Sequence, residues 1–257
     1  MYYIDLNSDL GESFGAYKIG NDEAVLQSVS SANVACGFHA GDPLVMLKTV
    51  KAAKSKGVQV GAHPGHPDLM GFGRRVMNCT PDEVYSYVLY QVGALQAICK
   101  AEGIFLQHVK PHGALYNQAA KDPELAYSIA CAVKDAGEGL ILLGLANSAF
   151  EEAASKAKVP FASEAFADRA YERDGTLVSR KKEGAVIHDA ELAARRVVQM
   201  VKDGTVEAID GTLIKLKPHS ICLHGDTPEA VEMAKAIRDT LEKEGITICP
   251  IKEVIGR

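Results

Sequence analysis

Features that assign a chain to several common classes of protein are missing from this sequence. Its 257 residues contain no cluster of Lys and Arg, and the formal net charge is −5 at pH 7. An acidic chain without a basic patch has little attraction for nucleic acid or anionic lipid. There is no cationic start followed by an apolar run, and no stretch of about 18 apolar residues. We therefore expect a cytoplasmic protein that uses neither nucleic acid nor a membrane as a partner.

The sequence also lacks the local motifs of disulfide scaffolds and nucleotide-binding enzymes. Its six cysteines include no C-x-x-C pair, and several lie in apolar patterns, which favours reduced thiols in a core. It has no G-x-x-x-x-G-K-[ST] loop, no G-x-G-x-x-G turn and no G-x-S-x-G elbow. If ATP takes part in the reaction, we do not expect this chain to bind it alone.

The chain does contain short apolar runs that alternate with longer amphipathic segments. The runs predict strands at residues 2–7, 32–36, 58–63, 106–111, 140–146, 160–167 and 220–225. The segments between them predict helices at residues 44–57, 81–103, 123–137, 148–158 and 190–204. Parallel strands need a crossover, usually a helix, so this order predicts an α/β fold with a parallel sheet. The length suits one domain over residues 1–257.

Turn and capping signals refine this prediction. Residues that commonly cap helices precede proline at Asp42, Thr80, Asp122 and Thr227, where each predicts the start of a helix. Residues 206–218 contain an Asp-Gly turn and predict a hairpin inserted before the last strand.

Ionisable and polar side chains gather at the carboxyl ends of the predicted strands. In chain order they are Asp5, Asn7, Asp9, Glu12, His39, His63, Lys110, His112, Asn147, Glu164, Asp168, Arg169, His224 and Asp226. In a closed parallel barrel these ends meet on one rim, where the βα loops build the active site. We therefore expect one site on an open rim, with His39 contributing little to packing. His66 and His108 are interpreted as structural residues.

Two kinds of chemistry fit this set of residues. His39, His63 and Asp9 are a familiar ligand set for zinc or another divalent ion, although no H-E-x-x-H spacing supports a metal. Without a metal, the same histidines are candidates for general acid and base. Arg74 and Lys110 are candidates for holding an anionic group of the substrate, and the alternative for Arg74 is a solvated loop.

Six segments together resemble the LamB/YcsF family, which includes the A subunit of ATP-dependent 5-oxoprolinase. They are "DLNSDLGE" (5–12), "ANVACGFHAGDP" (32–43), "GAHPGHPDLMGFGRR" (61–75), "VKPHGALYN" (109–117), "EAFADRAY" (164–171) and "CLHGD" (222–226). The resemblance covers nearly the whole chain in the family's order. It departs from the family at Gly65 and His66, where a serine and an aromatic residue are expected.

The resemblance implies a seven-stranded (β/α) barrel similar to those of glycoside hydrolases and polysaccharide deacetylases. It also implies ATP-dependent hydrolysis of 5-oxo-L-proline to L-glutamate, in a complex with subunits B and C that help to bind ATP. Two alternatives remain, a metal-dependent deacetylase or amidase that acts alone and a non-catalytic scaffold for the other subunits.

The implied reaction suggests roles for the residues at the strand ends. Asp9, His39 or His63 would activate water, directly or on a metal, and Lys110 or Arg74 would hold the substrate carboxylate. His112 or Asp226 would protonate the leaving ring nitrogen. The remaining candidates for substrate binding are Asn7, Glu164 and His224.

Overall fold

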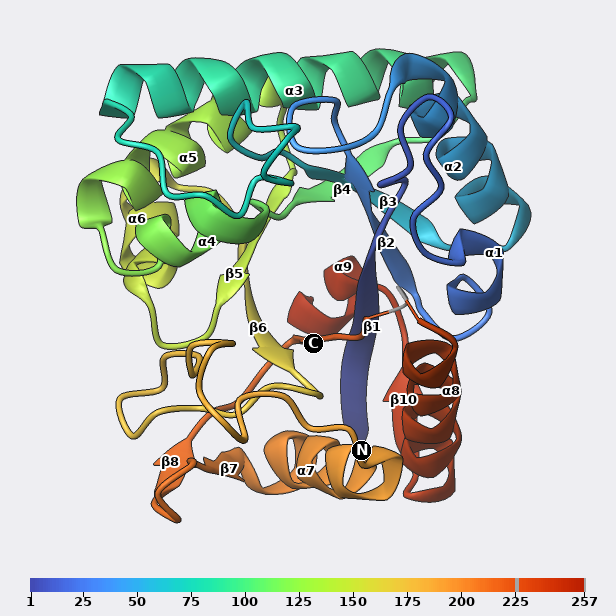
Figure 1. The fold of residues 1–257 in the computed structure, drawn as a ribbon, viewed down its shortest axis with the longest axis vertical. Coiled ribbons are helices and arrows are strands. Elements are labelled where there is room, and N and C mark those ends of the chain that lie inside the picture. The colour runs from blue at the N-terminus through green and yellow to red at the C-terminus, as the bar shows by residue number, and fades with distance from the viewer. Residues whose placement is uncertain (225–226, 257) are drawn as a thin grey trace.

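Seven parallel strands close into a barrel in the computed structural model, which describes residues 1–224 and 227–256 (Figure 1). They are β1 (Tyr2–Leu10), β2 (Ser31–Ala35), β3 (Gln59–His63), β4 (Leu106–Val109), β5 (Ile141–Leu145), β6 (Phe161–Phe166) and β9 (Ser220–Cys222). β1 pairs with β2 and also with β9, and β9 pairs with β6, so the sheet has no open edge at this point. The predicted seven-stranded (β/α) barrel is confirmed.

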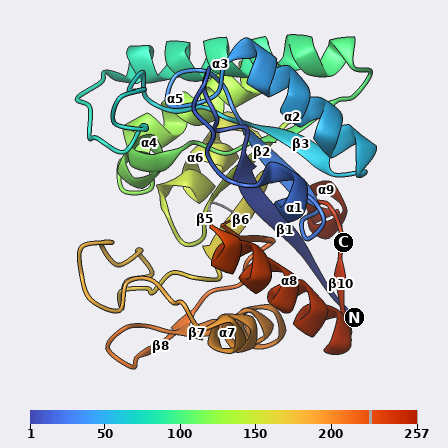
Figure 2. The same ribbon diagram turned by 45° about the vertical axis from the view of Figure 1, so that its right-hand side comes forward.

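Helices surround this barrel on the outside (Figures 1 and 2). The longer ones are α2 (Pro43–Ser55), α3 (Pro81–Ala101), α5 (Pro123–Ala136), α6 (Ala149–Ala157), α7 (Ala190–Asp203) and α8 (Pro228–Lys243). Shorter helices are α1 (Asp22–Val25), α4 (Gly113–Ala119) and α9 (Ile251–Ile255). Among the described residues, no helix combines the length and apolar character needed to cross a membrane.

The predicted helix starts and the predicted hairpin are confirmed. The Asp42 side chain accepts hydrogen bonds from the backbone N–H groups of Leu44 and Val45, and Thr80 forms a capping box with Glu83. β7 (Thr205–Glu207) and β8 (Leu213–Lys215) form an antiparallel pair apart from the barrel. The sequence patterns did not predict β10 (Ile246–Ile248), a three-residue strand that pairs with the beginning of β1.

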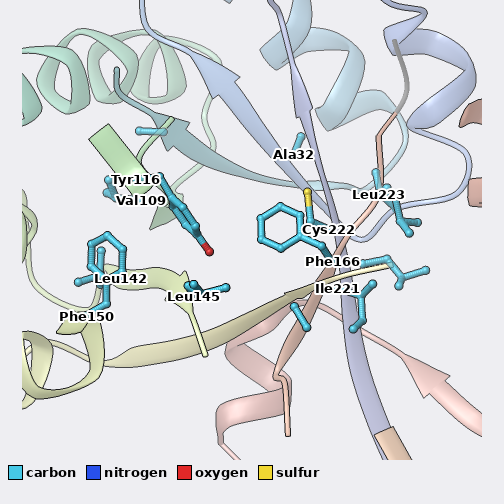
Figure 3. Packing of buried hydrophobic residues seen from close by; sticks show 14 of the residues in the cluster. Ala32, Val109, Tyr116, Leu142, Leu145, Phe150, Phe166, Ile221, Cys222 and Leu223 are labelled. Carbon is cyan, nitrogen blue, oxygen red and sulfur yellow. The ribbon is translucent and has the colours of Figure 1, made fainter. Parts of the chain in front are cut away.

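Alternation along the strands separates an apolar outer face from a polar interior. On β1, Ile4 and Leu6 belong to the main hydrophobic core, whereas the intervening Asp5 and Asn7 are buried on the other face of the strand. Side chains of this core, including those of Leu142 and Phe150, pack between the barrel and its helices (Figure 3).

A small apolar cluster lies apart from the main core. Ile251 of α9 packs there against Ile141, Leu143 and Ala162 of the barrel strands. The Lys252 backbone N–H, one residue further on, donates to the side-chain oxygen of Gln107 near the start of β4. α9 therefore covers the amino-terminal end of the barrel and leaves the carboxyl ends of the strands for the site.

Glycine at position 61 is required by the filling of the barrel. A Cβ atom placed there would overlap the imidazole of His108, which is itself fully buried and bonded to Asn33. We expect Gly61→Ala to lower the free energy of unfolding by ~1–3 kcal/mol through overpacking. Chemical denaturation measures this change.

Gly93 provides the matched control, because it is exposed within α3 and a Cβ there meets no atom within 4 Å. Gly93→Ala should raise stability by roughly 0.5–1 kcal/mol, since alanine is the better helix residue. Equal destabilisation by both substitutions would contradict the tight packing at Gly61.

Candidate active site

A cleft opens at the carboxyl ends of the strands, as predicted. Its lining among the described residues includes five Lys and Arg side chains, those of Arg74, Lys110, Lys121, Arg169 and Arg180, but a single carboxylate, that of Asp9. This excess of cations contrasts with the net charge of −5 for the whole chain. The cleft is therefore suited to an anionic ligand.

Lys110 occupies the centre of the cleft floor. Its Nζ lies 3.0 Å from Asp9 Oδ1 and 2.8 Å from Glu164 Oε1, and the Tyr116 hydroxyl donates to Glu164 at 2.7 Å. Figure 3 shows the Tyr116 ring reaching inward from α4, with Phe166 and Cys222 across the interior. The ammonium group joins residues of β1 and β6 to the end of β4.

These contacts set the charges of the floor. Burial alone would lower the pKa of Lys110, but the negative charges that face it, first that of Asp9, hold it well above its ordinary value. Burial alone would raise the pKa of Asp9, yet its interactions with His63 and Lys110 hold it well below its ordinary value. Lys110 is therefore protonated and Asp9 ionised at neutral pH.

Two residues expected to bind substrate, Asn7 and Glu164, are fully buried. Asn7 Oδ1 accepts hydrogen bonds from Lys110 Nζ at 3.2 Å and from Asn33 Nδ2 at 2.7 Å. Glu164 is enclosed between Lys110 and Tyr116. Their geometry assigns both residues to holding Lys110 beneath the cleft.

Three histidines lie together beside Asp9. His112 Nδ1 is 2.9 Å from His63 Nε2, and the rings of His39 and His112 stack in parallel with centroids 3.7 Å apart. His63 Nε2 lies 3.3 Å from Asp9 Oδ2. The tertiary structure thus brings together side chains from the ends of β1, β3 and β4 and from the loop after β2.

The expectation that His39 stands on an open rim is wrong. Its side chain is 0% exposed, because the His112 ring covers one face and the Phe72 ring meets it edge-on. Burial lowers the pKa of His39 and of His112 well below the ordinary value, so both rings are neutral at neutral pH.

Glu12 belongs to this cluster, although the sequence patterns assigned it no role in the site. Its Oε1 lies 3.3 Å from His39 Nε2 and 3.6 Å from His112 Nδ1. Gly11 precedes it with φ +70°, a conformation that suits glycine and turns the chain back over the strand end. In the sequence, the only indication that Glu12 belongs to the site was its position three residues after Asp9 in an acidic segment.

A second histidine–carboxylate pair lies on another side of the cleft. His224 Nδ1 is 2.7 Å from Asp168 Oδ2, and the Arg180 guanidinium lies 3.2 Å from His224 Nε2. Burial alone would lower the pKa of His224, but the Asp168 carboxylate beside it raises the pKa above the ordinary value. Asp168 and Arg180 belong to the long connecting segment between β6 and α7, residues 167–189 (Figure 1). Asp226, a predicted proton donor, lies outside the described residues.

The two arginines of "GFGRR" have different surroundings. Arg74 is exposed, lines the cleft and lies 5.2 Å from the centre of the Phe72 ring. Arg75 pairs with the buried carboxylate of Asp68 and so holds its own loop together. Only Arg74 is placed to meet a ligand in the cleft.

Comparison with known proteins agrees with this arrangement. The model of the LamB/YcsF family matches residues 4–256. The chain belongs to the LamB/YcsF family. Relatives from Pyrococcus abyssi and Thermococcus onnurineus, each named as the A subunit of 5-oxoprolinase, are 57% and 60% identical to it over 253 and 252 residues, covering 98% of this chain and 99% of each relative. The crystal structure of a "Lactam Utilization Protein" from Thermus thermophilus is 51% identical, with a TM-score of 0.92, and the match covers 96% of this chain and 99% of that one.

This LamB/YcsF member therefore combines three chemical elements in one cleft. An ionised carboxylate, that of Asp9, is fixed beside Lys110, and the clustered imidazoles lie next to it. His224 is held by Asp168, and Arg74 lies at the exposed side. Carboxylates, imidazoles and cations are groups that commonly take part in the hydrolysis of acyl bonds.

Removing the Lys110 ammonium should leave two buried carboxylates without their cation. We expect Lys110→Met to lower the free energy of unfolding by about 3 kcal/mol or more, because breaking a buried ion pair strands its partners. Lys51→Met removes a surface pair with Glu102 in which the lysine is 57% exposed, and should change stability by less than about 0.5 kcal/mol. Urea denaturation of both variants makes the comparison, and an equally small effect of both would contradict the structural role of Lys110.

Proposed function

We propose that this chain is the A subunit of an ATP-dependent 5-oxoprolinase, which opens the ring of 5-oxo-L-proline to give L-glutamate together with subunits B and C. The observation that carries the proposal is the ionised Asp9 beside Lys110 and the clustered imidazoles, within a cleft lined by cations. The names of the relatives, which refer to 5-oxoprolinase and to lactam utilization, support the same reaction class.

The chemistry of the substrate explains why ATP is needed. A five-membered lactam is a resonance-stabilised amide, and phosphorylation of its carbonyl oxygen would make the carbonyl carbon easier to attack. The chain has no phosphate-binding loop. We therefore assign nucleotide binding to the assembly with subunits B and C, and ring opening to this chain.

We assign binding of the anionic groups of the substrate to the arginine side chains of the cleft. Lys110 is already paired with Asp9 and Glu164, so it is poorly placed to accept a further carboxylate. The Arg74 guanidinium is exposed at the cleft and can bind the substrate carboxylate through two hydrogen bonds. Arg180 can meet a second anionic group from the side of His224.

Proton transfer falls to two residues on different sides of the cleft. Asp9 Oδ2 belongs to an ionised and partly exposed carboxylate, which can accept a proton from the attacking water. The Asp168 carboxylate raises the pKa of His224, and the protonated ring can donate to the leaving ring nitrogen once its Nε2 is released from Arg180. His112 is less suited to this second role, because its ring is neutral and its Nε2 bonds to the Phe72 carbonyl.

One alternative function has an observation in its favour. Glu12 and the three clustered histidines have the composition of a metal site, which suits a metal-dependent deacetylase or amidase acting alone. Such an enzyme would lose activity with a chelator and would not respond to ATP.

The proposed reaction is tested by measuring glutamate release from 5-oxo-L-proline. We expect release only when this chain, subunits B and C, and ATP with Mg²⁺ are all present. Release by this chain alone, without ATP, would favour the amidase instead. Full turnover by an assembled complex that carries Asp9→Asn would instead favour a non-catalytic, scaffolding role for this chain.

The Asp168–His224 pair predicts a change in pH dependence. His224 donates a proton only while it is protonated, and the Asp168 carboxylate raises its pKa. Asp168→Asn removes that support, so the loss of glutamate release on the alkaline side should begin at lower pH than in the wild type. In both proteins, turnover well above the pKa of His224 should be roughly a hundredfold or more below its maximum, because the acid is lost.

Asp174→Asn is the matched control for this experiment. Asp174 lies in the same segment between β6 and α7, is exposed, and accepts hydrogen bonds from Thr176 within its own turn. Its pH profile should match that of the wild type. An unchanged profile for Asp168→Asn would remove His224 from the role of acid.

A further inference from the structure

The proton positions on two clustered histidines follow from backbone carbonyls. His63 Nδ1 lies 2.7 Å from the Lys110 carbonyl oxygen, and His112 Nε2 lies 2.8 Å from the Phe72 carbonyl oxygen. A carbonyl oxygen can only accept a hydrogen bond, so each of these nitrogens carries the ring proton. When both rings are neutral, the other nitrogens, His63 Nε2 and His112 Nδ1, present lone pairs.

These two lone pairs face each other at 2.9 Å. Two carboxylate oxygens lie close by, Asp9 Oδ2 at 3.3 Å from His63 Nε2 and Glu12 Oε1 at 3.6 Å from His112 Nδ1. Four acceptors around one point repel each other unless a positive charge lies among them. This arrangement is the one expected around a cation.

His39 completes the donor set. Its Nε2 lies 3.3 Å from Glu12 Oε1, and its buried Nδ1 has no hydrogen-bond partner among the residues that the structure describes. One ligand atom from each of Glu12, His39, His63 and His112 lies within 4.8 Å of the others.

We propose that Glu12, His39, His63 and His112 bind one divalent transition-metal ion. Three imidazole nitrogens and one carboxylate oxygen suit Zn²⁺ in a tetrahedral site, and the backbone carbonyls that hold His63 and His112 supply the outer hydrogen bonds typical of metal-binding histidines. Glu12 takes the place that the sequence patterns assigned to Asp9, because Asp9 Oδ1 is occupied by Lys110 and Asn33.

The proposal is independent of the proposed reaction, since it concerns the binding of an ion in the absence of substrate, ATP and partner subunits. The full chain is freed of metal with a chelator and titrated with ZnCl₂ by calorimetry, and with CoCl₂ by visible absorption. We expect one Zn²⁺ per chain. Co²⁺ should give the intense visible bands of a four-coordinate ion.

Ligand variants connect this binding to the cluster. His63→Gln and Glu12→Gln should each weaken Zn²⁺ binding by at least about tenfold to a hundredfold, the loss expected even for an outer partner. The partly exposed Glu12 makes Glu12→Gln informative if His63→Gln fails to fold. Circular dichroism and melting temperature report folding for each variant.

His66→Gln is the matched control. His66 is a buried histidine in the loop that follows β3 and His63, but it bonds to Gln118 and contributes no atom to the cluster. It should bind Zn²⁺ as the wild type does. A wild-type chain that takes up neither Zn²⁺ nor Co²⁺, or folded Glu12→Gln and His63→Gln proteins that bind as tightly as the wild type, would overturn the proposal.

Discussion

The buried ammonium group of Lys110 is the interaction on which the rest of the site depends. It lies between the carboxylates of Asp9 and Glu164, which come from strands far apart in the sequence. Without this cation, two acidic groups would face each other in a medium where charge is poorly screened. Because Lys110 holds Asp9 ionised and in place, His63 meets a carboxylate of fixed position and charge.

Polar side chains fill much of the barrel interior, and their hydrogen bonds hold the charged residues of the site in position. Below Lys110, the Asn7 and Asn33 side chains bond to each other, and His108 and Ser220 bond to them in turn. Further from the cleft, three serine hydroxyls donate to the Asp5 carboxylate. Burial raises the pKa of Asp5 to about 6. Most of the apolar packing lies on the outer faces of the strands, and a smaller apolar cluster closes the amino-terminal end. The rest of the inner face can therefore carry polar and charged groups up to the cleft.

Much of the fold and part of the site could be predicted from sequence patterns. The strand runs, the capping residues before proline and the Asp-Gly turn each depend on neighbouring residues alone, and all three match the structure. β10 was not predicted, because three residues are too few to establish a period. Glu12 was not assigned a role in the site, since nothing in its neighbours shows that Gly11 turns it toward His39.

The sequence patterns by themselves determined an α/β fold with a parallel sheet and the strand ends at which polar groups collect, because alternation and strand order are local properties that repeat along the chain. The closed barrel was implied by the family resemblance. The sequence also determined the family, through segments that keep their order. Only the tertiary structure decided which of those groups touch. Whether Lys110 meets a substrate or Glu164, whether His39 is exposed, and which way the His63 and His112 rings hold their protons depend on residues distant in the sequence. Burial and charge then set the pKa values, and no local pattern contains either.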